Sequence, residues 1–172
     1  AVPSPYFRGV LHTMRGCAPR EATYVSVTKG IEAGSLKRMS EVITDELGNV
    51  CLGVLSGPTI AQELAHGLPT TAVVASRTAA VQQRMQRLFM SEALRIYTNN
   101  DVIGVEMGGS IKNIIAIACG IADGLGFGTN TKAALLTRGL AEMSRLGVAL
   151  GARRATFSGL SGLGDLVTTC AN

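Results

Sequence analysis

The sequence is poor in the residues that build metal centres and disulfide-stabilised folds. Among 172 residues there are two histidines and four cysteines, and no two cysteines form a CxxC motif. Zinc sites take Cys and His ligands at short spacings, so we expect no metal. The cysteines are Cys17, Cys51, Cys119 and Cys170. Cys51 and Cys119 lie in apolar contexts, and we expect both to be buried thiols in a reducing, cytoplasmic compartment.

The sequence also lacks a strong charge bias and long uncharged apolar runs. Sixteen Lys and Arg against twelve Asp and Glu give a formal net charge of +4, and the basic residues are dispersed. A nucleic-acid partner, which would need clustered Lys and Arg, is therefore not expected, whereas a mild positive excess suits phosphorylated small molecules. No stretch reaches eighteen uncharged apolar residues, so we expect no membrane span.

The apolar residues follow two patterns, short runs typical of strands and helical spacing typical of helices. Hydrophobic residues make up 47% of the chain, which excludes disorder. Up to residue 100, β-branched runs alternate with helical patterns, which predicts an α/β layer of several parallel strands, with the last strand as the candidate for antiparallel pairing. We expect strands at 24–30, 50–58, 70–76 and 94–98, and helices at 5–16, 35–47, 60–66 and 78–90.

After residue 100 the strand signals stop. The run Asn99-Asn100-Asp101 is typical of a helix N-cap. Helices are expected at 101–123 and 130–150, followed by a third, glycine-rich helical segment at 155–170. The sequence therefore predicts two domains, an α/β domain at 1–100 and an all-α domain at 101–172.

A lone lysine, Lys112, lies within an apolar helix that is otherwise fit for a packed interior. Helical geometry places Lys112 on one stripe with Asp123, and Asn113 on the adjacent stripe with Glu106. A buried ammonium needs a partner, and burial suits a lysine to acid–base work; the alternative is a lysine that reaches the surface. Close approach of a ligand or backbone is expected at the small residues Gly108, Gly109, Ala116 and Gly120.

Two loops follow predicted strands. Lys29 follows the first strand, and SGPTIAQELA (56–65) carries Gly57 before a helix that begins near Thr59. Open α/β sheets bind ligands at the carboxyl ends of their strands, and helix starts favour anions. Each loop taken alone is also compatible with an ordinary connection.

The remaining motifs are rich in glycine. The dinucleotide fingerprint GxGxxG is absent after any predicted strand, since GLGFGTN (124–130) and GLSGLGD (159–165) both follow helices. The second of these contains Asp165, followed by Thr168 and Thr169. Asp165 is either a simple helix cap or an acceptor that orients a lysine or a substrate hydroxyl.

Together these segments resemble one family, the bacterial-type NAD(P)-dependent glycerol-3-phosphate dehydrogenases. The resemblance implies a partial Rossmann-type sheet, containing only the later strands, joined to the start of a C-terminal helical domain. It also implies hydride transfer between sn-glycerol 3-phosphate and dihydroxyacetone phosphate with NAD or NADP, feeding glycerophospholipid synthesis, and a homodimer. The matching segments are 1–8, 25–32, 56–65, 105–143 and 158–170.

The resemblance further implies a role for each matching residue. Lys112 is implied as the acid–base residue at the C2 oxygen, with Lys29 and Asp165 as further catalytic residues. Lys29 is implied to touch both cofactor and substrate. The remaining implied contacts are Gly57, Thr59 and Asn113 with the substrate and Ala61 with the cofactor.

Departures from the family pattern limit this interpretation. The family's glycine fingerprint and its Arg-Asn pair are not found between residues 1 and 172, so we expect an interior fragment that is inactive or nearly so by itself. A related hydroxyacid dehydrogenase with the same plan is an alternative, against which the loops at 56–65 and 158–170 argue. A non-catalytic interaction module is another, which the joint presence of Lys29, Lys112 and Asp165 disfavours.

Overall fold

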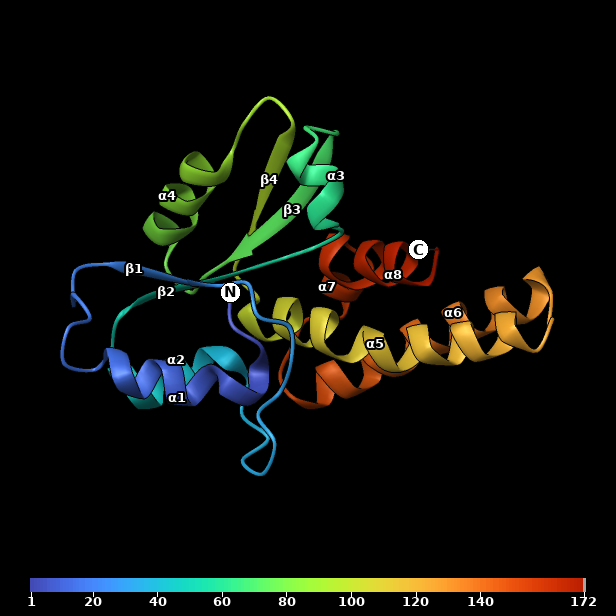
Figure 1. Ribbon diagram of the computed structural model, residues 1–172, viewed down its shortest axis with the longest axis horizontal. Coiled ribbons are helices and arrows are strands. Elements are labelled where there is room, and N and C mark those ends of the chain that lie inside the picture. Colours follow the sequence, from blue (N-terminus) through green and yellow to red (C-terminus); the bar gives the residue numbers. More distant parts are fainter. Residues whose placement is uncertain (172) are drawn as a thin grey trace.

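The computed structural model describes residues 1–171 and shows an α/β part followed by helices (Figure 1). The predicted fold class is confirmed, but the glycine-rich segment is not one helix. The first part contains β1 (Thr23–Ser26), β2 (Cys51–Ser56), β3 (Thr70–Ala75) and β4 (Leu94–Asn99), with α1 (Ser4–Met14), α2 (Met39–Leu47), α3 (Ala61–Ala65) and α4 (Ala79–Phe89). The second contains α5 (Val102–Gly124), α6 (Thr129–Ala149), α7 (Arg154–Phe157), the π-helical η1 (Leu160–Gly164) and α8 (Asp165–Ala171).

The four strands form one mixed sheet in the order β1-β2-β3-β4. β1 pairs with β2 in parallel and β3 with β4 in parallel, whereas β2 and β3 are antiparallel. The expectation that the last strand would reverse is therefore wrong. The β2–β3 connection, residues 57–69, contains only the short α3, and β3 runs back antiparallel to β2. The longer β3–β4 connection, residues 76–93, contains the eleven-residue α4 and returns the chain, so β4 runs parallel to β3.

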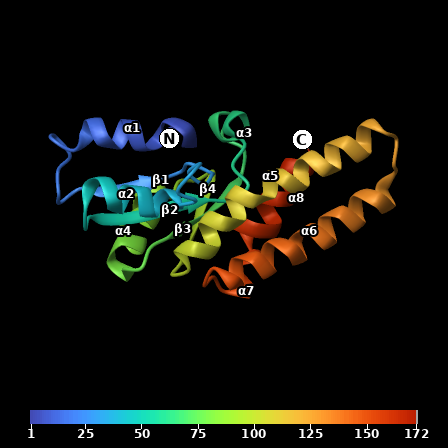
Figure 2. The same ribbon diagram turned by 90° about the horizontal axis from the view of Figure 1, so that it is seen from below.

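Side chains alternate between the two faces of the sheet, and different helices cover each face. Gly53 and Leu55 of β2 face α4, and Gly53 leaves room for the Met85 side chain. Val54 faces the other way and packs with Val105 of α5. On that same side, α1 and α2 pack together beside β1 and β2, opposite α4 (Figure 2). The sheet thus has helices on both faces, and the segments that follow β1 and β2 meet the first half of α5 at Gly109 and Ser110.

Helix α5 begins at the predicted N-cap. The Asp101 carboxylate accepts a hydrogen bond from Gly104 N at 2.9 Å, which confirms that prediction. It also accepts from Arg153 N at 2.8 Å and Thr156 Oγ1 at 2.6 Å, tying α7 to the start of α5. The change from strands to helices falls between Asn99 and Val102. Because α5 also packs against β2 and β3, the division into two domains stays a prediction.

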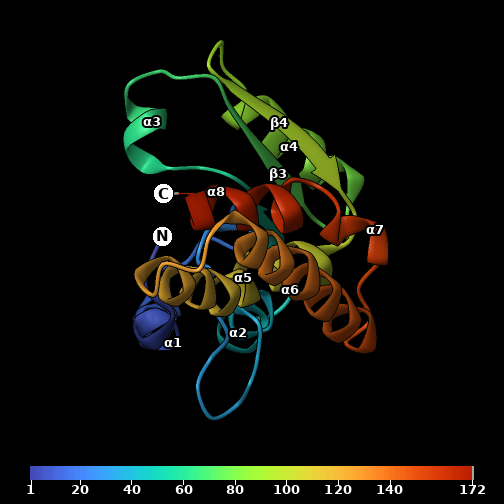
Figure 3. The same ribbon diagram turned by 90° about the vertical axis from the view of Figure 1, so that its right-hand side faces the viewer.

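By length and composition alone, α5 could cross a membrane, with a mean hydropathy of 1.4 in its most apolar stretch. Half of that stretch is buried inside the protein, against the sheet, α6 and α8 (Figure 3). Burial of this kind is typical of a core helix. The outer face remains apolar, with exposed fractions of 59% to 66% at Ile114, Ile117, Ile121 and Leu125.

The two cysteines predicted to be buried differ. Cys119 is buried in the core formed by α5, α6 and α8, as expected. Cys51 is exposed, so that prediction is wrong. It is the first residue of β2, and burial along this strand begins only at Gly53. The apolar run around Cys51 indicates a strand but not where along the strand burial begins.

Candidate active site

Asp165 joins two lysines that come from distant parts of the chain. Its Oδ2 accepts a hydrogen bond from Lys29 Nζ at 2.6 Å, and its Oδ1 accepts one from Lys112 Nζ. Asp165 is only 2% exposed and Lys112 only 6%, so the Lys112 pair is buried. The structure therefore brings together the three residues that the sequence nominated as catalytic.

A pair of glycines on α5 makes this approach possible. A Cβ at Gly108 would lie 2.4 Å from the Ser161 carbonyl oxygen of η1, and one at Gly109 would lie 2.7 Å from Ser56 Oγ at the end of β2. Neither distance is compatible with a side chain, so only glycine lets both segments reach α5. The close approach of a backbone is confirmed at Gly108, whereas the neighbours at Gly109 are the Ser56 and Lys29 side chains. Since η1 leads directly into Asp165, Gly108 helps to place that carboxylate over Lys112.

Lys112 has a second side-chain partner, Thr169 of α8. Lys112 Nζ lies 2.5 Å from Thr169 Oγ1, and Thr169 Oγ1 donates a hydrogen bond to the Asp165 carbonyl at 2.8 Å. The threonine hydroxyl therefore presents a lone pair to the ammonium. Sequence reasoning noted Thr169 but did not assign it to the site. The available signal was its spacing of four residues from Asp165, which places both on one face of a helix.

The loop between β2 and α3 closes over Lys29. Lys29 Nζ donates to the Gly57 carbonyl at 3.3 Å, and Thr59 Oγ1 donates to the same oxygen at 3.3 Å. Gly57 has φ of 137°, which side chains rarely adopt, and its Cα faces β3. Ala61 is exposed at the start of α3. Because α3 has only five residues, we assign no anion site to its N-terminus.

Hydrogen bonds from α5 hold two more segments near the lysines. Gly30 N donates to Ser110 Oγ at 3.0 Å, which fastens the turn after Lys29 to α5. The buried Glu106 carboxylate accepts from Ser40 N at 2.8 Å and from Arg38 Nη1 at 2.8 Å. Burial raises the pKa of Glu106, and the Ser40 and Arg38 hydrogen bonds oppose that rise. Sequence reasoning did not assign these supporting contacts.

Two expectations about the faces of α5 are corrected. Asp123 shares a face with Lys112 but lies about 16 Å further along the axis; it is exposed and pairs with Lys132 at 2.7 Å. No other part of the described chain comes within 4 Å of a Cβ placed at Gly120, so the backbone approach expected there is not found within residues 1–171, and approach of a ligand stays a prediction. The helical period specifies the direction in which a side chain points around the axis. Contact between two side chains also requires that they lie close together along the axis.

Asn113 is not part of the cluster as the structure describes it. It follows Lys112 directly, so its side chain is turned by about 100° around the helix. Asn113 is exposed, and among residues 1–171 its side chain makes no hydrogen bond to Lys112 or Asp165. Its partner on the adjacent stripe, Glu106, faces α2 instead. Contact of Asn113 with a substrate stays a prediction.

The cluster has two ammonium groups and one carboxylate, which leaves one positive charge. Burial, together with the neighbouring Lys112 charge, lowers the pKa of Lys29, while Asp165 opposes this change. A site with one uncompensated positive charge favours an anionic ligand. A buried ammonium held by a carboxylate and a hydroxyl can also exchange a proton with a ligand oxygen.

Two further features lie apart from this cluster. A cavity of about 630 Å³ is lined by α2, the start of β2 and the β3–α4 connection, and by none of the three clustered residues. Within residues 1–171, no three His, Cys, Asp or Glu side chains come together as a candidate metal site.

Comparison with protein families identifies two matching models. Residues 1–82 match the N-terminus of NAD-dependent glycerol-3-phosphate dehydrogenase, and residues 101–172 match its C-terminus. The matched segments contain Lys29, Gly57 and Thr59 on one side, and Lys112 and Asp165 on the other.

Curated relatives are similar along the whole chain. A glycerol-3-phosphate dehydrogenase (NAD(P)+) of Pelotomaculum thermopropionicum is 55% identical over 99% of this chain and 50% of its own length. One of the same name from Clostridium botulinum is 51% identical over 100% of this chain and 52% of its own length. The chain thus spans about half the length of the curated relatives it matches.

Solved structures agree with this assignment. A glycerol-3-phosphate dehydrogenase from Coxiella burnetii matches with a TM-score of 0.95 and 44% identity, over 99% of this chain and 52% of that protein. A glycerol-3-phosphate dehydrogenase from Saccharomyces cerevisiae matches with a TM-score of 0.90 and 30% identity, over 100% of this chain and 52% of that protein. On the fold, the two family matches and these similarities, the chain belongs to the NAD-dependent glycerol-3-phosphate dehydrogenase family.

Proposed function

We propose that the protein is an oxidoreductase that interconverts sn-glycerol 3-phosphate and dihydroxyacetone phosphate with NAD or NADP. The observation that carries the proposal is the Asp165 carboxylate between Lys29 and Lys112. The names of its relatives, glycerol-3-phosphate dehydrogenase (NAD(P)+), contain this substrate and this class of cofactor. Lys112 is buried and paired with Asp165, and the same carboxylate holds Lys29, which contacts the loop at Gly57.

Proton transfer in this proposal belongs to Lys112. During reduction, the Lys112 ammonium donates a proton to the C2 oxygen as that oxygen gains negative charge; during oxidation, neutral Lys112 removes the proton from the C2 hydroxyl. When bound, the nicotinamide cofactor supplies or takes up the hydride at C2. Asp165 and Thr169 hold Lys112 Nζ in one direction throughout, and the positive charge of Lys29 attracts the anionic ligands.

The residues present fit a dinucleotide near Lys29. The parallel strands β1 and β2 end at Ser26 and Ser56, shortly before Lys29 and Gly57, and open sheets bind ligands at the carboxyl ends of such strands. Ser56 Oγ, buried there, has no hydrogen-bond partner within residues 1–171. We assign Lys29 and Ala61 to the cofactor, and Lys29, Gly57, Thr59, Lys112, Asn113 and Asp165 to the substrate. We extend the proposal, on the family resemblance alone, to a cytoplasmic homodimer that feeds glycerophospholipid synthesis.

An activity assay tests this function directly. A protein of the relatives' full length that contains residues 1–172 is expected to oxidise NADPH when given dihydroxyacetone phosphate, and to ignore simple 2-keto acids. Residues 1–172 alone are expected to be inactive or nearly so, because binding and orientation supply much of the rate of such a reaction. Reduction of 2-keto acids in place of dihydroxyacetone phosphate would favour the hydroxyacid dehydrogenase interpretation. No turnover of either substrate by the longer protein would contradict the proposal.

The KM for dihydroxyacetone phosphate is expected to rise as the pH becomes alkaline. This rise should begin at a lower pH than the one at which an ordinary lysine loses its proton. Lys29 is charged below its pKa and neutral above it, and burial with the Lys112 charge lowers that pKa. Lys29→Arg keeps a positive charge throughout the range, so its KM should stay flat across this limb. The check is a KM–pH profile for both proteins. The same alkaline rise in Lys29→Arg would show that another group causes it.

A further inference from the structure

Lys29 is followed directly by a closed loop, residues 30–38, which leads to α2. Ile31, near the start of this loop, pairs with Arg38, at its end, as an antiparallel bridge. Ile31 also packs against the core formed by α5, α6 and α8. Because the bridge joins the two ends of the 30–38 loop, a displacement at Arg38 is passed to the turn that carries Lys29.

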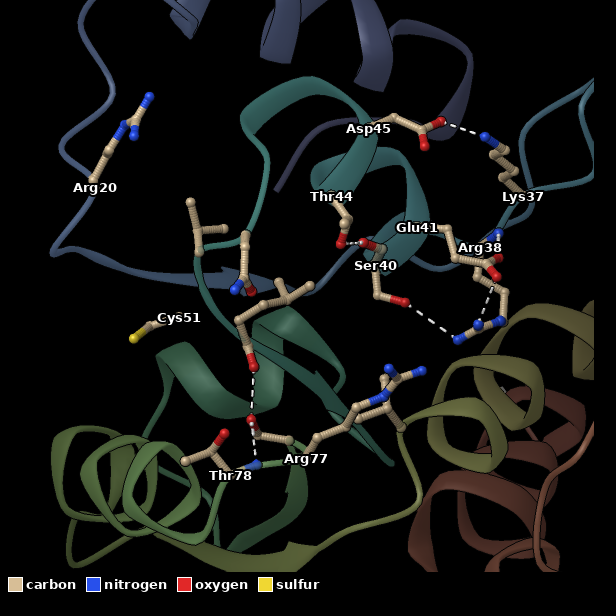
Figure 4. A pocket seen from close by; sticks show the side chains of 15 residues that line it. Arg20, Lys37, Arg38, Ser40, Glu41, Thr44, Asp45, Cys51, Arg77 and Thr78 are labelled. Carbon is tan, nitrogen blue, oxygen red and sulfur yellow. Dashed lines mark hydrogen bonds and ion pairs between the residues drawn. The ribbon is translucent and has the colours of Figure 1, made fainter.

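Glu106 of α5 holds the end of the 30–38 loop. Its buried carboxylate accepts hydrogen bonds from Arg38 Nη1 at 2.8 Å, from Ser40 N at 2.8 Å and from Ser40 Oγ at 2.6 Å. Figure 4 shows Arg38 and Ser40 turned toward one another at the start of α2, where Arg38 Nη1 also donates to Ser40 Oγ at 3.2 Å. Since Ser40 lies in the first turn of α2, the carboxylate also lies where a helix favours negative charge.

The start of the 30–38 loop is fastened to the same face of α5. Ser110 follows Glu106 by four residues, which places both on one face of the helix. Ser110 Oγ accepts a hydrogen bond from Gly30 N at 3.0 Å. Lys112, two residues after Ser110, is turned by about 160° from it around the axis. Helix α5 therefore holds the loop on one face and Lys112 on another.

The side chain of Lys29 runs along α5 between these two faces. A Cβ at Gly109 would lie 3.5 Å from Lys29 Cγ and 3.6 Å from Lys29 Cδ, so the lysine stem lies against the helix at this glycine. Beyond it, Lys29 Nζ reaches Asp165 Oδ2 at 2.6 Å. How far the ammonium extends toward Asp165 therefore depends on where the 30–38 loop is fastened.

We infer that Glu106 is a positioning residue: by holding the 30–38 loop on α5, it places the Lys29 ammonium beside Asp165 in the substrate site. The inference rests on the function proposed for the lysine cluster. Lys112 has its own partners, Asp165 and Thr169, on α8. Removal of the Glu106 charge should therefore weaken binding of the anionic substrate more than it changes proton transfer.

Steady-state kinetics of Glu106→Gln test the inference, in a protein of the relatives' full length that contains residues 1–172. Glutamine keeps the shape of the side chain, but it has no charge to pair with Arg38 and its amide nitrogen cannot accept a hydrogen bond. We expect the KM for dihydroxyacetone phosphate to rise about tenfold and kcat to change less than about twofold, because binding is affected more than chemistry. Ser40→Ala removes one of the three hydrogen bonds and should raise KM by a smaller factor.

Glu46→Gln is the matched control. Glu46 of α2 is as buried as Glu106, each being 9% exposed, but its carboxylate pairs with Arg8 of α1 at 2.7 Å. This variant should keep both KM and kcat. In a Lys29→Ala background, Glu106→Gln should have no further effect on KM, because a residue that acts through Lys29 then has nothing left to position.

Amide hydrogen exchange separates this inference from the proposed reaction, because it needs no turnover. The Gly30 amide, which is bonded to Ser110 Oγ, should exchange about tenfold or more faster in Glu106→Gln and at an unchanged rate in Glu46→Gln. Absence of turnover in the unchanged protein would contradict the proposed function, and the exchange rates would still decide whether Glu106 holds the loop.

Thermal unfolding shows whether both glutamine variants are folded at the assay temperature, and Ser40→Ala, which keeps the carboxylate, replaces Glu106→Gln if that protein is not. The inference is overturned if the Gly30 amide exchanges equally fast in the Glu106 and Glu46 variants. It is also overturned if Glu106→Gln raises the KM of the Lys29→Ala protein by the same factor as that of the unchanged protein.

Discussion

Replacement of Lys112 by alanine is expected to lower turnover by about 10²–10⁴-fold, the usual contribution of a general acid or base. The protein to use is one of the relatives' full length that contains residues 1–172. Alanine removes the group that exchanges a proton with the C2 oxygen, while Asp165 keeps Lys29 as a partner at 2.6 Å. The fold should therefore survive, and the loss should appear in kcat more than in KM.

Two further lysine variants make the test specific. Lys112→Arg keeps the charge but cannot release its proton at physiological pH, so its turnover should stay as low as that of Lys112→Ala. Lys132→Ala is the control: it removes a half-buried lysine of α6 that pairs with Asp123 of α5, and it should change turnover little. Steady-state rates with dihydroxyacetone phosphate and NADPH provide the measurement. Wild-type turnover in Lys112→Ala would refute the role assigned to Lys112.

Alanine at two glycines of α5 is expected to change stability in opposite directions. Gly108→Ala would place a methyl group 2.4 Å from the Ser161 backbone oxygen, so the helix and η1 must move apart. Overpacking of this kind costs about 1–3 kcal/mol of the free energy of unfolding, and more where backbone is the neighbour. Gly120→Ala meets nothing within 4 Å among the described residues. It should raise the free energy of unfolding by about 0.5–1 kcal/mol, because alanine favours the helix.

Of these two alanine variants, only Gly108→Ala should also change turnover. Displacement of η1 moves Asp165 and Thr169 away from Lys112, so Gly108→Ala should lower turnover in addition to stability. Gly120→Ala should leave turnover unchanged, since its position is exposed. Urea unfolding and steady-state rates measure the two effects. Equal changes of stability in both variants would show that the contact with Ser161 does not constrain α5.

Much of the fold could be predicted because its signals are local. The short apolar run that contains Val54 and Leu55 and the capping run before α5 depend on neighbours in sequence, and both indicated their elements correctly. The ends of elements were less certain. The glycine-rich segment 155–170 divides into α7, η1 and α8, and η1 lies against α5 at Gly108.

The candidate site could be predicted only in part. Lys29, Lys112 and Asp165 were each identifiable as unusual residues at suitable places in the sequence. Their partners were not, since Asp123 shares a helical face with Lys112 but the structure supplies Asp165 from 53 residues further on. Thr169, Ser110 and Glu106 act through contacts with other segments, which no spacing within one element specifies.

The sequence by itself determined the order of strands and helices, the capped apolar helix that carries Lys112, and the family to which the chain is similar. Only the tertiary structure decided that β3 reverses beside β2, that Cys51 lies open to a cavity, and that one buried carboxylate serves two lysines. The physical reason is that secondary structure follows from interactions a few residues apart. Pairing of buried charges depends instead on which segments come together when apolar surface is buried. That outcome depends on the whole chain and not on a few neighbouring residues.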